Sequence, residues 1–173
     1  MSLAAKLNTM DEVAARAALA NCCAASAWVD NMIARRPFAD DAAARDAAEA
    51  AWRPLGESDW LEAFAAHPVI GDLSSLRAKD AATKELAAVE QSAAAGAAET
   101  ALRELADLNR DYRQRFGFIF IVCAAEKSAA EMRAILRDRI GNTRAEELQN
   151  AAAEQLKITR SRLERLACRP GDP

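Results

Sequence analysis

The sequence contains a single histidine and four cysteines among its 173 residues. No two cysteines have the C-x-x-C spacing of a zinc or redox motif, and neighbours such as Cys22 and Cys23 rarely form a disulfide with each other. We therefore expect free thiols in a reducing compartment. Because zinc sites draw mainly on histidine and cysteine ligands, the scarcity of both predicts that the protein binds no transition metal.

Long hydrophobic runs and an excess of basic residues are also absent. No stretch approaches the roughly 20 apolar residues of a membrane-spanning helix, and residues 1–10 are too polar to indicate a signal peptide. The 23 basic and 26 acidic residues are interleaved and give a formal net charge of −3, whereas a nucleic-acid-binding protein clusters its basic residues. We expect a cytoplasmic protein that binds neither membranes nor nucleic acid.

Glycine and proline are scarce, with six and five residues respectively. Alanine, leucine, glutamate and arginine dominate the remainder, and all four have a high helix propensity. The sequence therefore predicts an all-α fold. Its length suits a single domain with its own core, which we place at residues 1–168, followed by a polar tail at 169–173.

Capping residues, glycines and prolines give the boundaries of the predicted helices. A hydroxyl residue three positions before a glutamate is typical of a reciprocal N-cap, and this pattern begins at Thr9, Ser128 and Thr143. A short helix from Ser58 is expected to end at Pro68, because the residue before proline disfavours the helical conformation. The other predicted helices are 10–24, 26–35, 41–52, 84–94, 97–116 (ending at Gly117), 129–139 and 144–168, with a loop at 68–83.

Residues 116–125, FGFIFIVCAA, form the one strongly apolar and partly β-branched stretch. The pattern alone fits a buried strand or a buried helix. Because the sequence offers no partner strand, we favour a helix or an extended loop over 118–125.

The single histidine, His67, lies at the end of a predicted helix and directly before Pro68. On a helical wheel its ring points in the direction of Trp60 and Phe64 and therefore toward the interior, so we expect it to be at least half buried. Two interpretations remain open. His67 is either a core residue hydrogen-bonded to a backbone carbonyl or a group for acid/base catalysis.

Two further polar residues fall among apolar neighbours. Arg162 lies between Ile158 and Leu166 in an apolar arc of the last helix, so its guanidinium either reaches water along its stem or meets an anion, and a buried guanidinium needs a carboxylate partner. Glu90 lies one turn after Leu86 on a short alanine-rich helix. If these two side chains face one cavity with an imidazole, they supply an acid/base pair and an anion clamp.

The chain also contains, in this order, the segments DWLEAFAAHPVIGD, EQSAAAG, YRQRFGFIFIVCAAEKSAAEMRAILRDRIGNTRAEEL and LKITRSRLERL. Together they resemble the 2-oxo-4-hydroxy-4-carboxy-5-ureidoimidazoline (OHCU) decarboxylase family of urate degradation, and the similarity covers essentially the whole chain. The resemblance implies an all-helical fold of about eight or nine helices and a homodimer. It also implies decarboxylation of OHCU to (S)-allantoin without a cofactor.

The resemblance assigns roles to individual residues. His67 corresponds to the catalytic histidine of the HP-x-IG motif, Glu90 to the glutamate of the EQ pair, and Arg162 to the arginine of the KI-xxx-RL motif. Their implied roles are an acid/base pair of His67 and Glu90, either of which protonates carbon, and substrate orientation by Arg162. The implied substrate-binding residues are Pro68, Ala87, Gln91 and a lining segment of Phe120, Ile121, Val122, Cys123 and Ala124.

The chain departs from the family pattern at two positions. Val69 stands where arginine is common, and Ala87 stands where serine is common. The lost hydroxyl removes one neutral hydrogen bond worth about 0.5–1.5 kcal/mol, so we expect about tenfold weaker binding at most. Two alternatives stay open: a decarboxylase of another small ureido acid, and a non-enzymatic helical dimerisation module in which His67 is a core residue and Glu90 and Arg162 form an ion pair.

Overall fold

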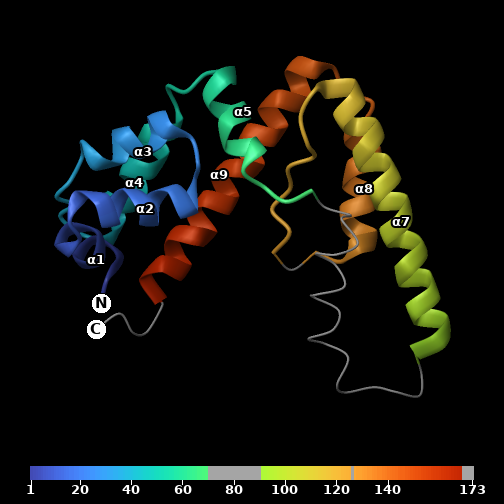
Figure 1. Ribbon diagram of the computed structural model, residues 1–173, viewed down its shortest axis with the longest axis horizontal. Helices are drawn as coiled ribbons and strands as arrows, with labels where there is room; N and C mark the ends of the chain where they lie inside the picture. The colour runs from blue at the N-terminus through green and yellow to red at the C-terminus, as the bar shows by residue number, and fades with distance from the viewer. Residues whose placement is uncertain (70–90, 126, 169–173) are drawn as a thin grey trace. The chain divides into compact units, whose positions relative to one another are not determined.

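The computed structural model describes residues 1–69, 91–125 and 127–168 (Figure 1). These residues contain eight helices and no strand, which confirms the predicted all-α class. The helices are α1 (Leu3–Thr9), α2 (Glu12–Cys22), α3 (Ser26–Ile33), α4 (Asp41–Trp52), α5 (Glu57–Ala65), α7 (Gln91–Phe116), α8 (Ala129–Arg139) and α9 (Arg144–Cys168).

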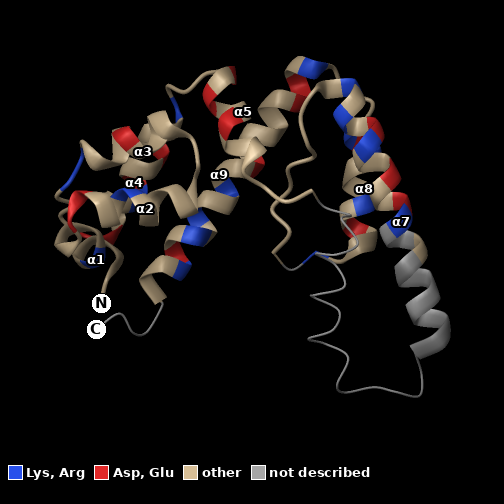
Figure 2. Ribbon diagram, viewed as in Figure 1, with Lys and Arg blue, Asp and Glu red and all other residues tan. Residues whose placement is uncertain are grey.

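The chain divides into two compact units, which are described separately below. The terminal unit consists of residues 1–66 and the chain from residue 152 onward, and the middle unit consists of residues 67–151. The extent of the predicted domain, residues 1–168, stays a prediction. Across the described ranges, no helix is both long and apolar enough to cross a membrane. Figure 2 shows acidic and basic residues interspersed along the helices of both units.

In the terminal unit, α3 packs against α2, α4 and α5, while α1 packs against α4. Trp28 of α3 is fully buried, and its indole N–H donates to the carbonyl of Ala48 at 3.0 Å. Side chains cap the helix starts: Ser2, Asp11 and Asp40 accept hydrogen bonds from the backbone of the first turns of α1, α2 and α4.

In the middle unit, α7 and α8 lie side by side (Figure 1). Tyr112 at the end of α7 is fully buried and contacts the rings of Phe116, Phe118 and Phe120 edge-to-face, at centroid distances of 4.6, 5.8 and 5.4 Å. Gly117 ends α7 as predicted, with a φ of +82° that favours glycine. The chain then continues as an irregular segment without helix or strand, so of the two alternatives favoured for residues 118–125, a helix or an extended loop, the structure has the loop.

Local capping signals predicted several boundaries correctly. The bounds of α4, α8 and α9 agree with the predictions, and Glu131 accepts from the amide and hydroxyl of Ser128, both at 2.7 Å. Glu146 accepts in the same way from Thr143 at 2.8 and 2.7 Å. These starts are encoded within one helical turn, which is why the sequence alone sufficed.

Other boundaries were wrong. The Thr9 hydroxyl donates to the carbonyl of Ala5 inside α1, a helix that was not predicted, and Asp11 caps α2 instead. Likewise α5 begins at Glu57, where Asp59 accepts from the Gly56 amide at 3.0 Å, so Ser58 is not the cap. The predicted break between 94 and 97 does not exist, because α7 is continuous from Gln91. The start of the predicted helix 84–94 and the loop after residue 69 lie outside the described residues.

Candidate active site

His67 lies in the turn that follows α5. The helix ends at Ala65, two residues earlier than predicted from Pro68, with Ala66 as its C-cap. His67 is partly buried, as expected, although it lies outside the helix on which the wheel placed it. Pro68 is exposed, and Val69 is 39% exposed.

The glutamate motif is only partly described. Gln91 is the first residue of α7, and Ala87 and Glu90 lie outside the described residues. The roles of these three residues stay predictions.

The segment expected to line the substrate lies in the middle unit. Phe120, Ile121 and Val122 are buried, Cys123 is partly buried and Ala124 is exposed. The carbonyl of Ile121 accepts from Arg139 at 2.9 Å, and that of Cys123 accepts from Lys127 at 2.9 Å. Within the described part of the chain, no group accepts a hydrogen bond from the amides of Phe120, Ile121 or Val122. These three N–H groups are therefore candidates for binding a ligand.

A cavity of about 360 Å³ in the middle unit is lined by sequence neighbours of two predicted site segments, and none of the predicted site residues that the structure describes is among its lining. Val69 adjoins Pro68, Ile119 adjoins Phe120, and both line this cavity. The remaining lining residues come from one face of α7: Ala106, Asn109, Arg110, Arg113 and Gln114. Arg110 pairs with Asp107 at 2.5 Å, so the positive charge of this wall comes mainly from Arg113. A positive charge suits an anionic ligand, and the volume lies in the range of small-molecule sites.

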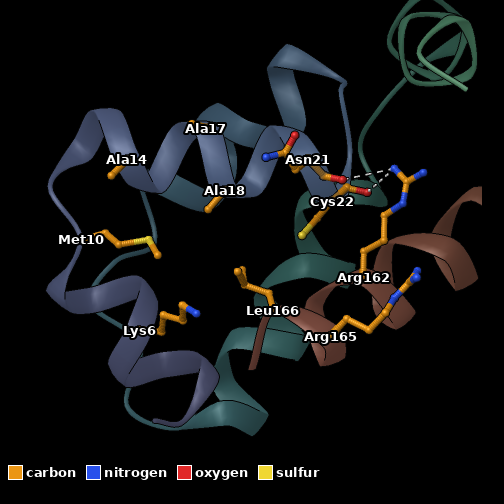
Figure 3. A pocket seen from close by; sticks show the side chains of 10 residues that line it. All are labelled: Lys6, Met10, Ala14, Ala17, Ala18, Asn21, Cys22, Arg162, Arg165 and Leu166. Carbon is orange, nitrogen blue, oxygen red and sulfur yellow. Dashed lines mark hydrogen bonds between the residues drawn. The ribbon is translucent and has the colours of Figure 1, made fainter. Parts of the chain in front are cut away.

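Arg162 lines a separate cavity, within the terminal unit (Figure 3). Its Nη1 group donates to the carbonyls of Asn21 and Cys22, both at 3.3 Å, in the last turn of α2. Carbonyls at a helix C-terminus lack intrahelical partners and carry partial negative charge. The Nη1 group of the partly buried guanidinium therefore binds backbone carbonyls, and the predicted alternatives, water or an anion, stay predictions for its other donors. Its part in substrate binding stays a prediction.

This cavity in the terminal unit has a volume of about 680 Å³. Its described lining contains three cations and no acidic side chain; the residues are Lys6, Met10, Ala14, Ala17, Ala18, Asn21, Cys22, Arg162, Arg165 and Leu166. In Figure 3, Lys6 and Leu166 lie across the hollow from Asn21. His67 and the segment from Phe120 to Ala124 belong to the middle unit. The convergence of His67, Glu90 and Arg162 on one site therefore stays a prediction.

The two buried thiols of the terminal unit, Cys22 and Cys23, are expected to be unreactive. Burial raises the pKa of Cys22 and of Cys23 from 9.0 to about 11, whereas Cys168 is exposed. At pH 8 about one in a thousand of the buried thiols is ionised, so a thiol reagent should modify Cys168 much faster than either buried cysteine. Peptide mapping after brief labelling checks this order, and protein unfolded in denaturant is the control. Equal labelling of Cys22 and Cys168 in the native protein would contradict the buried placement.

The same pKa shifts predict how the stability of the fold changes at alkaline pH. Thiols of the unfolded chain ionise near pH 9 and those of the folded chain near pH 11, so the unfolded state holds fewer protons between these values. The free energy of unfolding should therefore be unaffected by these groups below about pH 8 and fall as the pH rises toward 11. Urea titrations of wild-type protein and of the Cys22→Ala/Cys23→Ala variant check this, because the variant should show a smaller alkaline loss.

Sequence reasoning missed a buried polar cluster that contacts the lining segment. Glu147 is 0% exposed and accepts hydrogen bonds from Tyr112, Arg139 and Asn142. Burial and the neighbouring carboxylate raise the pKa of Tyr112 far above its usual value, so its hydroxyl stays protonated and donates to Glu147. The sequence did contain a signal for this cluster. Glu147 lies four residues before Ala151, and this spacing places it on the buried face of α9.

The sequence and the fold are similar to those of known proteins. The OHCU decarboxylase family matches residues 8–164. The uric acid degradation bifunctional protein TTL of Arabidopsis thaliana is 37% identical over 145 residues, which are 84% of this chain and 45% of that protein. An OHCU decarboxylase of Amia calva is 42% identical over 57 residues, a third of each chain. The chain thus spans less than half of either of these two relatives.

More complete matches come from a third relative and from solved structures. The OHCU decarboxylase of Halalkalicoccus jeotgali is 29% identical over 82% of this chain and 78% of that protein. An OHCU decarboxylase crystallised in the presence of (S)-allantoin is 35% identical, with a TM-score of 0.70 over 87% of this chain and 96% of that chain. A crystal structure of (S)-allantoin synthase, at 17% identity and a TM-score of 0.67, has the same fold over 95% of this chain and 54% of that chain.

The helical fold of the described residues is thus shared with a decarboxylase of solved structure. The chain belongs to the OHCU decarboxylase family.

Proposed function

We propose that this protein converts OHCU to (S)-allantoin and carbon dioxide in urate degradation. Family membership supports the proposal, as does the 35% identity to a decarboxylase crystallised with (S)-allantoin. The observation that carries it furthest is the cavity lined by Val69 and Ile119, because these residues directly follow the histidine–proline motif and directly precede the predicted lining segment. The positive charge of Arg113 on its wall suits a substrate that carries a carboxylate.

The chemistry asks little of the protein beyond positioning and proton transfer. The bond between the ring carbon and the carboxylate breaks, its electron pair enters the conjugated system of the substrate, and a proton is then added to that carbon on one face. His67 and Glu90 are the proposed acid/base pair. Arg162 and Gln91 orient substrate oxygens, and the amides of Phe120, Ile121 and Val122 donate to the imidazoline and ureido groups.

The direct test generates OHCU from urate with uricase and hydroxyisourate hydrolase, then adds this protein. The proposal predicts that OHCU disappears at a rate proportional to protein concentration. Related ureido carboxylates, tested in parallel, should react more slowly. Loss of OHCU at the spontaneous rate would favour a non-enzymatic module, and preference for another acid would favour a drifted specificity.

No cofactor enters the proposed reaction, and this gives a further prediction. We expect the rate to be unchanged after dialysis against EDTA, because proton transfer and hydrogen bonding do not require a metal. Among the described residues, no three histidine, cysteine or acidic side chains gather in a way that would hold a metal ion. A rate that falls with EDTA and recovers with one added metal would contradict the proposed chemistry.

We also propose that the protein is a cytoplasmic homodimer without affinity for nucleic acid. Family membership supports these proposals, together with the free cysteines of the described chain and its interleaved charges. Sedimentation equilibrium should give twice the mass of the chain, and a single-chain mass would exclude the dimer.

A further inference from the structure

The cluster around Glu147 is built on one carboxylate without solvent access. The Tyr112 hydroxyl lies 2.5 Å from Oε1, and the Arg139 Nε and Nη2 atoms lie 2.7 and 2.5 Å from the same oxygen. Asn142 and Asn150 donate to Oε2 at 2.8 and 3.3 Å. The side chain of Arg139 is only 12% exposed. All five residues belong to the middle unit.

The other edge of the Arg139 guanidinium faces the lining segment. Its Nη1 group donates to the carbonyl of Ile121 at 2.9 Å, and its Cζ atom lies 4.8 Å from the centre of the Phe120 ring. The ring of Phe120 also contacts Tyr112, at 5.4 Å and an interplanar angle of 73°. Glu147 therefore holds two side chains that both touch the segment.

The hydrogen bond to Ile121 fixes more than one carbonyl. In a planar trans peptide, the carbonyl of Ile121 and the N–H of Val122 belong to the same rigid unit and point in opposite directions. Holding the carbonyl against Arg139 therefore turns the amide of Val122 away from Arg139. That amide has no acceptor among the described residues.

Stability alone gives little reason for such a cluster. Replacing a buried ion pair with well-packed apolar side chains is often neutral or stabilising, because desolvating two charges is costly. The guanidinium of Arg139 donates to the Glu147 carboxylate on one edge and to the Ile121 carbonyl on the other, which apolar side chains cannot do. It sets the orientation of one peptide plane.

We infer that Arg139, held by Glu147, is a positioning residue that aims the Val122 amide at the substrate. The inference rests on the proposed function, in which the segment from Phe120 to Ala124 lines the substrate. Arg139 itself is not a catalytic residue, because it acts through the backbone of its neighbour.

The test compares two variants that each weaken the grip on Glu147. Arg139→Lys keeps the positive charge but removes the fork, so one ammonium group cannot hold both Glu147 and the Ile121 carbonyl. Tyr112→Phe, the matched control, removes one bond to Glu147 and leaves the Arg139–Ile121 contact in place. We expect Arg139→Lys to lower kcat/KM for OHCU on the order of 10²-fold, and we expect Tyr112→Phe to stay near the wild-type value.

Amide hydrogen exchange supplies a readout that does not depend on activity. Val122 is 5% exposed, so burial protects its amide even though no described group accepts from it. Exchange at this amide should accelerate in Arg139→Lys, where the peptide unit is no longer held, and not in Tyr112→Phe. If both variants lose activity and protection equally, or if neither does, the inference is overturned. If wild-type protein does not convert OHCU, the proposed function fails, and exchange at Val122 alone decides whether Arg139 positions the segment. Should Arg139→Lys not fold, Glu147→Asp replaces it, because the shorter carboxylate draws the guanidinium away from Ile121.

Discussion

We expect His67→Asn to lower kcat/KM for OHCU by about 10²–10⁴-fold, the usual contribution of a general acid or base. Asparagine resembles histidine in size and forms hydrogen bonds, but it cannot exchange a proton near neutral pH. His67 lies in a turn outside α5 and is only partly buried, so the fold should tolerate the change. Steady-state assays measure the loss, and an unchanged far-UV circular dichroism spectrum shows that the helices persist.

The single histidine permits an independent control. With no affinity tag, the one imidazole signal in a proton NMR titration belongs to His67 without assignment. The pH profile of kcat/KM for the free enzyme should share an inflection with that titration. Two results would contradict a catalytic role and make His67 a structural residue: a near-normal rate in His67→Asn, or a pH profile of kcat/KM with no inflection at the pH where the imidazole titrates.

Arg139→Met should cause the largest loss of stability. The change leaves the carboxylate of Glu147 buried without its counter-ion, and breaking a buried pair in this way costs about 3–5 kcal/mol. Arg137 is the matched control, because it lies on the same helix and pairs with Glu104 at 3.3 Å, with side chains that are 55% and 41% exposed. Arg137→Met should therefore cost less than about 1 kcal/mol.

Urea unfolding of both variants measures this difference in the free energy of unfolding. The m-value should stay unchanged if each variant unfolds in two states. Equal losses for Arg137→Met and Arg139→Met would show that Glu147 is not isolated from solvent in the folded protein.

Local interactions made parts of this fold predictable. The starts of α8 and α9 follow from the Ser128 and Thr143 caps, whose partners lie three residues away. The predicted cap at Thr9 was wrong. Thr9 and Glu12 have the hydroxyl-to-glutamate spacing of a cap, but they lie on either side of the gap between α1 and α2, where the carboxylate of Asp11 is the cap. Such a pattern shows that a hydroxyl and a glutamate are suitably spaced, but not which neighbour competes for the amides.

Distant partners were harder to predict. His67 and Arg162 stood out because polar side chains interrupted apolar surfaces, yet the carbonyls that bind Arg162 come from Asn21 and Cys22, about 140 positions away. Glu147 went unnoticed for a related reason. Its i, i+4 line continues through Ala151 and three further buried residues, but its partners Tyr112 and Arg139 come from other helices. The family resemblance indicated which segment lines the substrate, whereas the contacts of Arg139 and Tyr112 with that segment became visible only in the structure.

Catalysis that yields one enantiomer is the central claim, and the circular dichroism of the allantoin produced tests it most directly. Uncatalysed decay of OHCU gives racemic allantoin, which has no net signal. With uricase and hydroxyisourate hydrolase supplying OHCU, this protein should produce the full signal of (S)-allantoin, and His67→Asn at the same concentration should not. A racemic product from folded wild-type protein would contradict the account.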